Sequence, residues 1–523
     1  MTRRHWKRYT AIGLLALLIV GVTVLSLVLP GRGEPRITAA PAQPMLFPKG
    51  FLWGVAIAGQ QAESLPASDW TTFEAEVFRD HRFAVGEKIG ATPPGDIHGF
   101  GRWSEQVRTH KAGFDLRYGQ DIDAAAQLGL NAFRVSIEWA RLFPRPGMTE
   151  PDPEAVAYYH AVFAAMRSRG IEPIVTLFHY VSPAWFFEAD AHGKRGWERS
   201  DALTLWQTYV DAVANHFIPD VQIWCTLNEP NVYLYDAYVL GTYPPGEKRG
   251  DFGGARDVYA ALLHAHAQAY RTLHRVAASR GATVSVGLTQ NMQIFEPYHR
   301  YSPLDRTLAW VVDNVWNWDF LDAIANGRMR LTTTDIDLPI EGLAGTEDYV
   351  GVNYYSRNYV RGDWRHPLAP DVGTVAPDLP REERNDLGWP SYPHGFYETL
   401  TKVGKRYAKP VMILENGTAD SADDDKQRQR YLVAHIREAW LAQRDGVDIR
   451  SYIHWSLMDN FEWNEGFDAR FGLFAVDYEH DFRRTARPSA ALYGEIVHAN
   501  GLSPTVLKRY LEDTGPAAGA SGQ

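Results

Sequence analysis

Eight short apolar runs, rich in β-branched and aromatic residues, alternate along the chain with amphipathic helical patterns. The runs cover Phe51–Ala58, Asn131–Trp139, Ile171–His179, Val221–Asn228, Ala282–Gln290, Asp348–Tyr355, Pro410–Glu415 and Ile449–Ser456. Their continuous apolar character is typical of strands that are buried on both faces. The helical patterns cover Asp121–Gly129, Pro153–Arg169, Leu203–Phe217, Val258–Arg280, Gly395–Arg406 and Asp425–Arg444. Eight strand–helix units in succession predict an α/β fold, a single (β/α)8 TIM barrel with extended βα loops.

Residues 49–505 show no break in composition, so we assign them to one barrel domain despite the length of 523 residues. A barrel of this kind can exceed about 400 residues when its loops carry insertions. Two stretches, Pro66–Gly113 and Arg361–Pro393, are predicted to be long insertions after the first and sixth strands. Long loops of this kind usually shape the rim of a binding site. Residues 506–523 are predicted to form a disordered tail.

The N-terminal 48 residues differ in composition from the rest of the chain. A basic flank, residues 1–10, precedes 19 uncharged residues from Ala11 to Leu29, and residues 30–48 form a proline-rich spacer. The uncharged run is long enough to cross a bilayer and is longer than the apolar core of most cleaved signals. We therefore expect a single-pass signal-anchor with the N-terminus inside and the barrel outside the cytoplasm, or a secreted barrel if the segment is cleaved.

The charge balance and the single cysteine exclude several classes of function. The net charge is −10, and the first thirty residues contribute four positive charges and no negative ones, so the remainder carries −14. A body this acidic argues against nucleic acid as a partner. Cys225 is the only cysteine, so an internal disulfide and a cysteine-based metal site are excluded. His264 and His266, two apart on a predicted helix, do not share a face, and we predict neither a metal nor a cofactor.

Glu229 lies in the stretch Thr226–Asn231, directly after the fourth apolar run and directly before a proline. A carboxylate next to an apolar strand is costly to bury without partners. The proline prevents the strand from continuing. Glu229 is therefore expected where a strand ends and a loop begins. A glutamate of this kind considered alone is more often a cap or an ion-pair member than a catalyst.

Glu415 ends the seventh apolar run in the same way. The carboxyl ends of all barrel strands meet at one face, so Glu229 and Glu415 are expected to point into one mouth. Two carboxyl groups that face one pocket are the machinery of glycoside hydrolysis. One of them needs a raised pKa to donate a proton, and the other must stay ionised.

Polar and aromatic side chains follow most of the other strands. Amide, imidazole, guanidinium and indole groups together suit a polyhydroxylated ligand, because they hydrogen-bond hydroxyls and stack on the C–H face of a sugar ring. Each residue also has a structural interpretation, for example a core histidine for His179 or a barrel ion pair for Arg134. The residues at these strand ends include Gln61, Arg134, His179, Asn228, Asn353, Tyr355, Trp455, Glu462 and Trp463.

From about Phe51 to Pro488 the chain resembles glycoside hydrolase family 1, the retaining β-glycosidases. The resemblance rests on several ordered motifs, which begin with the opening strand, Phe51–Glu63. The others are Phe133–Pro144, Thr226–Asn231, Gly351–Tyr355, Ile413–Gly417, His454–Trp463 and Arg470–Asp477. The resemblance implies double displacement without a cofactor, with Glu415 as the nucleophile and Glu229 as the acid/base. In retaining enzymes the two carboxyl groups are about 5–5.5 Å apart.

The resemblance also implies roles for the surrounding residues. Asn228 matches the residue that holds the sugar 2-hydroxyl, while Tyr355 and Arg134 match groups that contact the nucleophile. Glu462 favours a glycone without phosphate. The wall of the sugar site is matched by Gln61, His179, Trp455, Glu462 and Trp463, with Phe471 as a nearby aromatic residue and Asn353 on the same motif as Tyr355.

Three departures from the family pattern bear on specificity. After His179 the family usually has Trp-Asp-Leu-Pro, whereas this chain has Tyr180-Val-Ser-Pro183; in addition, Gln60 replaces a common Tyr and Ser64 a common Gly. We expect a β-glucosidase-like enzyme that acts on small-molecule or lipid-linked β-glycosides. The alternatives are a membrane-associated transglycosidase that acts on glycolipids and a catalytically silent sugar-binding protein. Glycone, aglycone and oligomeric state stay open.

Overall fold

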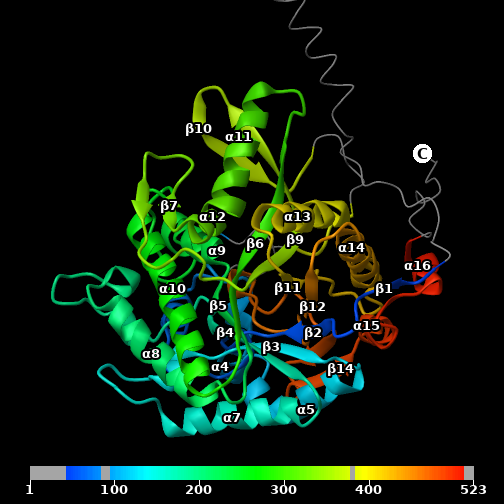
Figure 1. Ribbon diagram of the computed structural model, residues 1–523, viewed down its shortest axis with the longest axis horizontal. Coiled ribbons are helices and arrows are strands. Elements are labelled where there is room, and N and C mark those ends of the chain that lie inside the picture. Colours follow the sequence, from blue (N-terminus) through cyan, green and yellow to red (C-terminus); the bar gives the residue numbers. More distant parts are fainter. Residues whose placement is uncertain (1–42, 84–92, 94, 377–382, 512–523) are drawn as a thin grey trace, which may run out of the picture.

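The computed structural model describes residues 43–83, 93, 95–376 and 383–511. Eight parallel strands close into a barrel, and helices surround it (Figure 1). In barrel order the strands are β2 (Leu52–Ala56), β3 (Ala132–Ser136), β4 (Glu172–Phe178), β5 (Ile223–Asn228), β6 (Ser285–Pro297), β9 (Tyr349–Asp363), β11 (Val411–Asn416) and β12 (Ile449–Trp455). The barrel is closed by the pairing of β12 with β2, which brings Trp455 opposite Ala56. The predicted (β/α)8 barrel is confirmed.

All six predicted helices are present, and each follows a barrel strand. They are α5 (Phe114–Gln127), α7 (Pro153–Arg167), α8 (Ala202–Phe217), α10 (Arg256–Ser279), α13 (Pro393–Tyr407) and α14 (Lys426–Arg444). Gly170 and Gly281, just beyond α7 and α10, have φ of 72° and 64°, the left-handed conformation that favours glycine at a helix end. Further helices that were not predicted include α11 (Pro303–Asp313), α12 (Asp319–Asn326) and α15 (Pro488–His498).

Two strands are longer than predicted. β6 continues to Pro297 and β9 to Asp363, and they stay paired beyond the barrel, with Pro297 opposite Val360. β10 (His366–Gly373) then returns antiparallel to β9, and this extension projects beside α11 (Figure 1). The predicted insertion at 361–393 therefore begins inside a strand. The extension was missed because polar residues interrupt the apolar run after Gln290, as they do in sheets with one face exposed.

The edges of the barrel domain also differ from the predicted boundaries. β1 (Met45–Leu46) pairs with β15 (Gly501–Leu502), and Phe47 is buried with its ring 4.4 Å from that of Phe51. The end of the predicted spacer is therefore part of the body. At the other end α16 (Pro504–Leu511) extends into the predicted tail. Apolar contacts hold both segments against the barrel domain. Such contacts cannot be recognised in short terminal stretches of sequence.

The predicted anchor, residues 11–29, and its basic flank lie outside the described residues. No helix within the described ranges combines the length and the apolar character that a bilayer crossing requires.

Candidate active site

A cavity of about 300 Å³ opens at the carboxyl ends of the barrel strands. Both glutamates lie in its wall. Of the other predicted site residues, Arg134 and Asn353 lie behind the wall and hydrogen-bond to the acids, while the remaining ones line it: Gln61, His179, Asn228, Tyr355, Trp455, Glu462, Trp463 and Phe471. The structure therefore brings every predicted site residue together around one cavity.

Glu415, near the end of β11, is held on both carboxyl oxygens. Arg134 donates from Nη1 to Oε1 at 2.5 Å, and the Tyr355 hydroxyl donates to Oε2 at 2.5 Å. Burial raises the pKa of Glu415 to about 7; the Arg134 charge opposes this rise and the Glu229 charge adds to it. Glu415 is thus a carboxyl whose ionisation depends on a buried guanidinium.

Glu229 directly follows β5 and has a different set of partners. The amides of Asn291 and Asn353 donate to its Oε1 at 3.0 and 2.8 Å. The Tyr180 hydroxyl donates to Oε2. Among the described residues, no Lys or Arg forms an ion pair with Glu229. The two glutamates therefore share the cavity but differ in their environment, since Glu415 faces a cation and Glu229 faces neutral donors.

Asn228 is oriented by Arg134. Its Oδ1 accepts from Nη2 of Arg134 at 2.7 Å and from the Asn353 amide at 3.3 Å. Because Oδ1 accepts both bonds, the Nδ2 group is left to donate toward a ligand in the cavity.

Glu462 forms another part of the cavity wall. The Trp455 indole donates to its Oε1 at 3.0 Å and the Gln61 amide to its Oε2 at 3.1 Å. Burial raises the pKa of Glu462 to about 8, partly offset by the Trp455 hydrogen bond and increased by the Glu415 charge. His179 stacks at 6.1 Å from Trp455 and 6.2 Å from Trp463. Burial lowers its pKa well below the usual value, so its imidazole is neutral and offers one donor and one acceptor.

Three residues of the cavity wall have a left-handed backbone. Tyr180, Glu229 and Trp463 have φ of 69°, 42° and 51°. Each such non-glycine residue costs about 1–3 kcal/mol and persists only where its surroundings hold it in place. Strained residues of this kind cluster at functional sites, which agrees with the location of these three.

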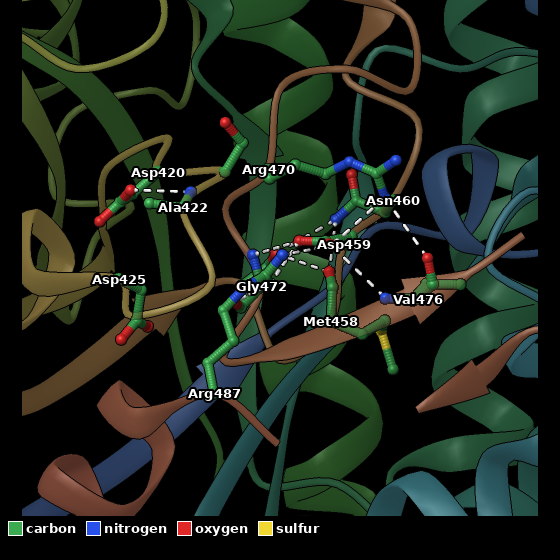
Figure 2. A network of polar contacts seen from close by, with 12 residues as sticks. Asp420, Ala422, Asp425, Met458, Asp459, Asn460, Arg470, Gly472, Val476 and Arg487 are labelled. Carbon is green, nitrogen blue, oxygen red and sulfur yellow. Dashed lines mark hydrogen bonds and ion pairs between the residues drawn. The ribbon is translucent and has the colours of Figure 1, made fainter. Parts of the chain in front are cut away.

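The loop after β12, which contains Glu462 and Trp463, is anchored by buried Asp459 (Figure 2). Arg487, just before α15, donates from Nη1 and Nη2 to the two Asp459 oxygens at 2.9 and 2.8 Å. Arg470 and the backbone amide of Gly472 also donate to Asp459, at 3.3 and 3.0 Å. These arginines hold the pKa of Asp459 below its usual value. The network fixes the start of the loop that bears the cavity wall.

The first insertion supports the same loop from another side. Trp70 of α3 (Asp69–Arg79) is fully buried, and its ring lies 4.6 Å from that of Trp463. Part of the predicted 66–113 insertion therefore packs behind the cavity.

Several residues of the cavity were not predicted. Asn291 lies one residue past the predicted end of the fifth strand, and the rule that selects polar residues at strand ends would have found it. The others, apart from Gln293 on β6, lie on loops or irregular helices, where periodicity gives no signal. They include Asp236, Tyr243, Gln293, Trp316, Leu387 and Trp389. In the described part of the chain, no group of three His, Cys, Asp or Glu side chains could hold a metal ion.

Comparison with known proteins identifies a family. The sequence model of glycosyl hydrolase family 1 matches residues 103–502. The chain is 30% identical over 505 residues to a β-galactosidase of Sulfolobus acidocaldarius, covering 87% of this chain and 96% of that protein. It is also 30% identical over 486 residues to β-glucosidase A of Thermotoga maritima, covering 87% and 98%. A solved β-glycosidase structure from Pyrococcus horikoshii matches with a TM-score of 0.76 and 34% identity, covering 89% and 98%.

The Asp459 network predicts a stability effect. Asp459→Asn removes the buried carboxylate that is hydrogen-bonded to Arg487, and breaking a buried pair costs about 3–5 kcal/mol. We expect the free energy of unfolding, measured by urea titration, to fall by that amount. Asp337→Asn is the matched control, because the Arg328–Asp337 pair is about 40% exposed on both sides and such pairs contribute little. Equal effects in the two variants would contradict an anchoring role for Asp459.

Proposed function

The chain belongs to glycosyl hydrolase family 1, and from this membership we propose that it cleaves β-glycosides by double displacement, with Glu415 as the nucleophile and Glu229 as the acid/base. The observation that supports these two roles is that Glu415 and Glu229 have different hydrogen-bond partners. Glu415 accepts from a guanidinium and a phenol, which favour a carboxylate ready to attack. Glu229 accepts from two amides and a phenol, and among the described residues it forms no ion pair with a cation, so it differs from Glu415 in having only neutral partners.

In the first displacement a carboxylate oxygen of Glu415 bonds to the anomeric carbon. The bond from that carbon to the leaving oxygen breaks, and the proton of Glu229 moves to this oxygen. In the second displacement Glu229 takes a proton from water, whose oxygen replaces Glu415 at the anomeric carbon. Two inversions at one carbon retain the β configuration.

The glycone is proposed to bind between Asn228 and Glu462. The Nδ2 group of Asn228 would donate to the 2-hydroxyl, as the family resemblance implies. Glu462, Gln61 and His179 would bind the remaining hydroxyls, and Trp455 would stack on the ring.

The charge of the cavity favours a neutral substrate. Its lining includes the carboxyls of Glu229, Asp236, Glu415, Glu462 and Glu465 and, within the described residues, no Lys or Arg. A phosphorylated or sulfated glycoside would face these carboxyl groups with no cationic side chain in the described lining. Neutral β-glucosides and β-galactosides are therefore the proposed substrates, and the names of the relatives agree with this.

The two proposed roles predict different products with azide. Glu415→Ala should lose turnover by several orders of magnitude, since it lacks the nucleophile; azide entering its place gives an α-glycosyl azide. Glu229→Ala should still form the glycosyl-enzyme from a 2,4-dinitrophenyl β-glucoside, and azide then attacks from the β face. The azide products are identified by proton NMR, with Glu465→Gln as a control that keeps both carboxyls of the pair. A β-azide from Glu415→Ala would sink the assignment.

The pH dependence of kcat/KM provides a further test. Glu415 must be ionised to attack, and burial together with the Glu229 charge raises its pKa to about 7. We therefore expect the acidic limb of kcat/KM near pH 7. Arg134→Met should move this limb to higher pH, because the cation that favours the carboxylate is lost.

Arg141→Met serves as the control for that shift. Arg141 is another largely buried arginine, but it pairs with Glu63 at 2.7 Å and is not part of the cavity lining. Its replacement should leave the acidic limb in place. An acidic limb near pH 4.5 in the unmodified enzyme would contradict the raised pKa of Glu415.

A further inference from the structure

Tyr180 replaces the tryptophan that is usual after the third strand in this family, and its hydroxyl lies against the acid/base. We propose that Tyr180 is a positioning residue for proton transfer, which donates to Oε2 of Glu229 and stabilises the carboxylate that remains once the Glu229 proton has moved to the leaving group. The inference rests on the proposed role of Glu229.

The hydrogen bonds of Glu229 determine which oxygen can hold the proton. Oε1 accepts from the amides of Asn291 and Asn353 at 3.0 and 2.8 Å. Amide N–H groups can only donate, so a proton on Oε1 would face two donors. The proton of a neutral Glu229 is therefore on Oε2, the oxygen that the Tyr180 hydroxyl contacts.

Both amides are themselves held in place. The Oδ1 of Asn353 accepts from the Thr289 hydroxyl at 2.8 Å. The Oδ1 of Asn291 accepts from the Gln293 amide at 3.0 Å and from the Trp316 indole at 3.2 Å. These bonds fix the amide orientation, so Nδ2 rather than Oδ1 faces Glu229. Oε1 is permanently occupied, and the chemistry takes place at Oε2.

The Tyr180 ring has little freedom to move away. It is buried, lies 5.3 Å from the Trp463 ring and 5.9 Å from Tyr243, and stacks on Tyr233 at 6.3 Å with an interplanar angle of 9°. The backbone at both ends of the hydrogen bond is left-handed, with φ of 69° at Tyr180 and 42° at Glu229. Packing thus holds two strained residues in contact.

The phenol remains a donor throughout the reaction. Burial and the neighbouring Glu229 charge raise the pKa of Tyr180 well above its usual value, so Tyr180 keeps its proton. A hydrogen bond from a phenol to a carboxylate is stronger than one to a neutral carboxyl. The contact therefore strengthens as the proton leaves Oε2 for the glycosidic oxygen, and the proton of Tyr180 stays in place.

Tyr180→Phe removes this donor while the ring keeps its shape. We expect kcat/KM for an alkyl β-glucoside, which needs proton transfer, to fall about tenfold, in keeping with a hydrogen bond to a charged group. A 2,4-dinitrophenyl β-glucoside, whose leaving group needs no proton, should change less than about twofold in kcat/KM. The basic limb of the pH profile should move to higher pH, because the ionised form has lost a donor.

Two tyrosines supply controls. Tyr233→Phe alters a phenol that stacks on Tyr180 without lining the cavity, and it should change neither the leaving-group dependence nor the pH limbs. Tyr355→Phe removes the donor to Glu415, so it should slow all leaving groups and raise the acidic limb instead.

An equal loss of kcat/KM on both substrates with unchanged pH limbs would overturn the proposal, because Tyr180 would then only fill space.

If Tyr180→Phe does not fold, 3-fluorotyrosine at position 180 keeps the ring and makes the donor more acidic. The basic limb should then move to lower pH, and an unmoved limb would again overturn the role. Azide rescue of Glu229→Ala tests the acid/base assignment separately, so its failure is distinguishable from failure at Tyr180.

Discussion

The guanidinium of Arg134 is the interaction on which the active-site end of the barrel depends. It is 1% exposed, and a buried cation must be paired and hydrogen-bonded to be tolerated. From β3 it reaches Thr176 on β4 at 3.0 Å, Asn228 on β5 at 2.7 Å and Glu415 on β11 at 2.5 Å. One side chain thus fixes polar groups from three other strands. Loss of Arg134 would therefore disturb the orientation of Asn228 as well as the charge of Glu415.

The cavity tolerates three buried acids because each has different partners. Glu415 faces a cation, Glu229 faces two amides and a phenol, and Glu462 faces an indole and an amide. Burial disfavours ionisation of all such groups, and only a specific cation or set of donors reverses that preference. A nearby carboxylate also raises the pKa of its neighbour, as Glu229 does for Glu415 and Glu415 does for Glu462. The pKa values of Glu415 and Glu462 therefore each depend on the charge of a neighbouring acid in the cavity.

The sequence was sufficient to predict the barrel and the site residues at the ends of its strands. Buried parallel strands give continuous apolar runs, and a polar residue that ends such a run is recognisable, as with Glu229, His179 and Glu415. The extension of β6 and β9 was missed because polar residues interrupt the apolar runs beyond Gln290 and Tyr355. Trp70 and Trp389 could not be placed from sequence, since their positions depend on how the two insertions fold back over the rim. Tertiary contacts between distant loops leave no periodic pattern.

The strained residues connect the fold to the proposed chemistry. A left-handed backbone at Glu229 turns the chain directly after β5, so the carboxyl lies in the cavity instead of continuing the strand. The proline that follows occupies the first position of α9 (Pro230–Leu234), where its missing N–H costs no hydrogen bond. Trp463 is strained in the same way and is held between Trp70 and Tyr180. The surrounding aromatic packing offsets this strain. The insertion that supplies Trp70 therefore contributes to the geometry of the proposed acid/base, because Trp70 packs on Trp463 and Trp463 packs on Tyr180. Among its described residues, the insertion makes no polar contact with Glu229.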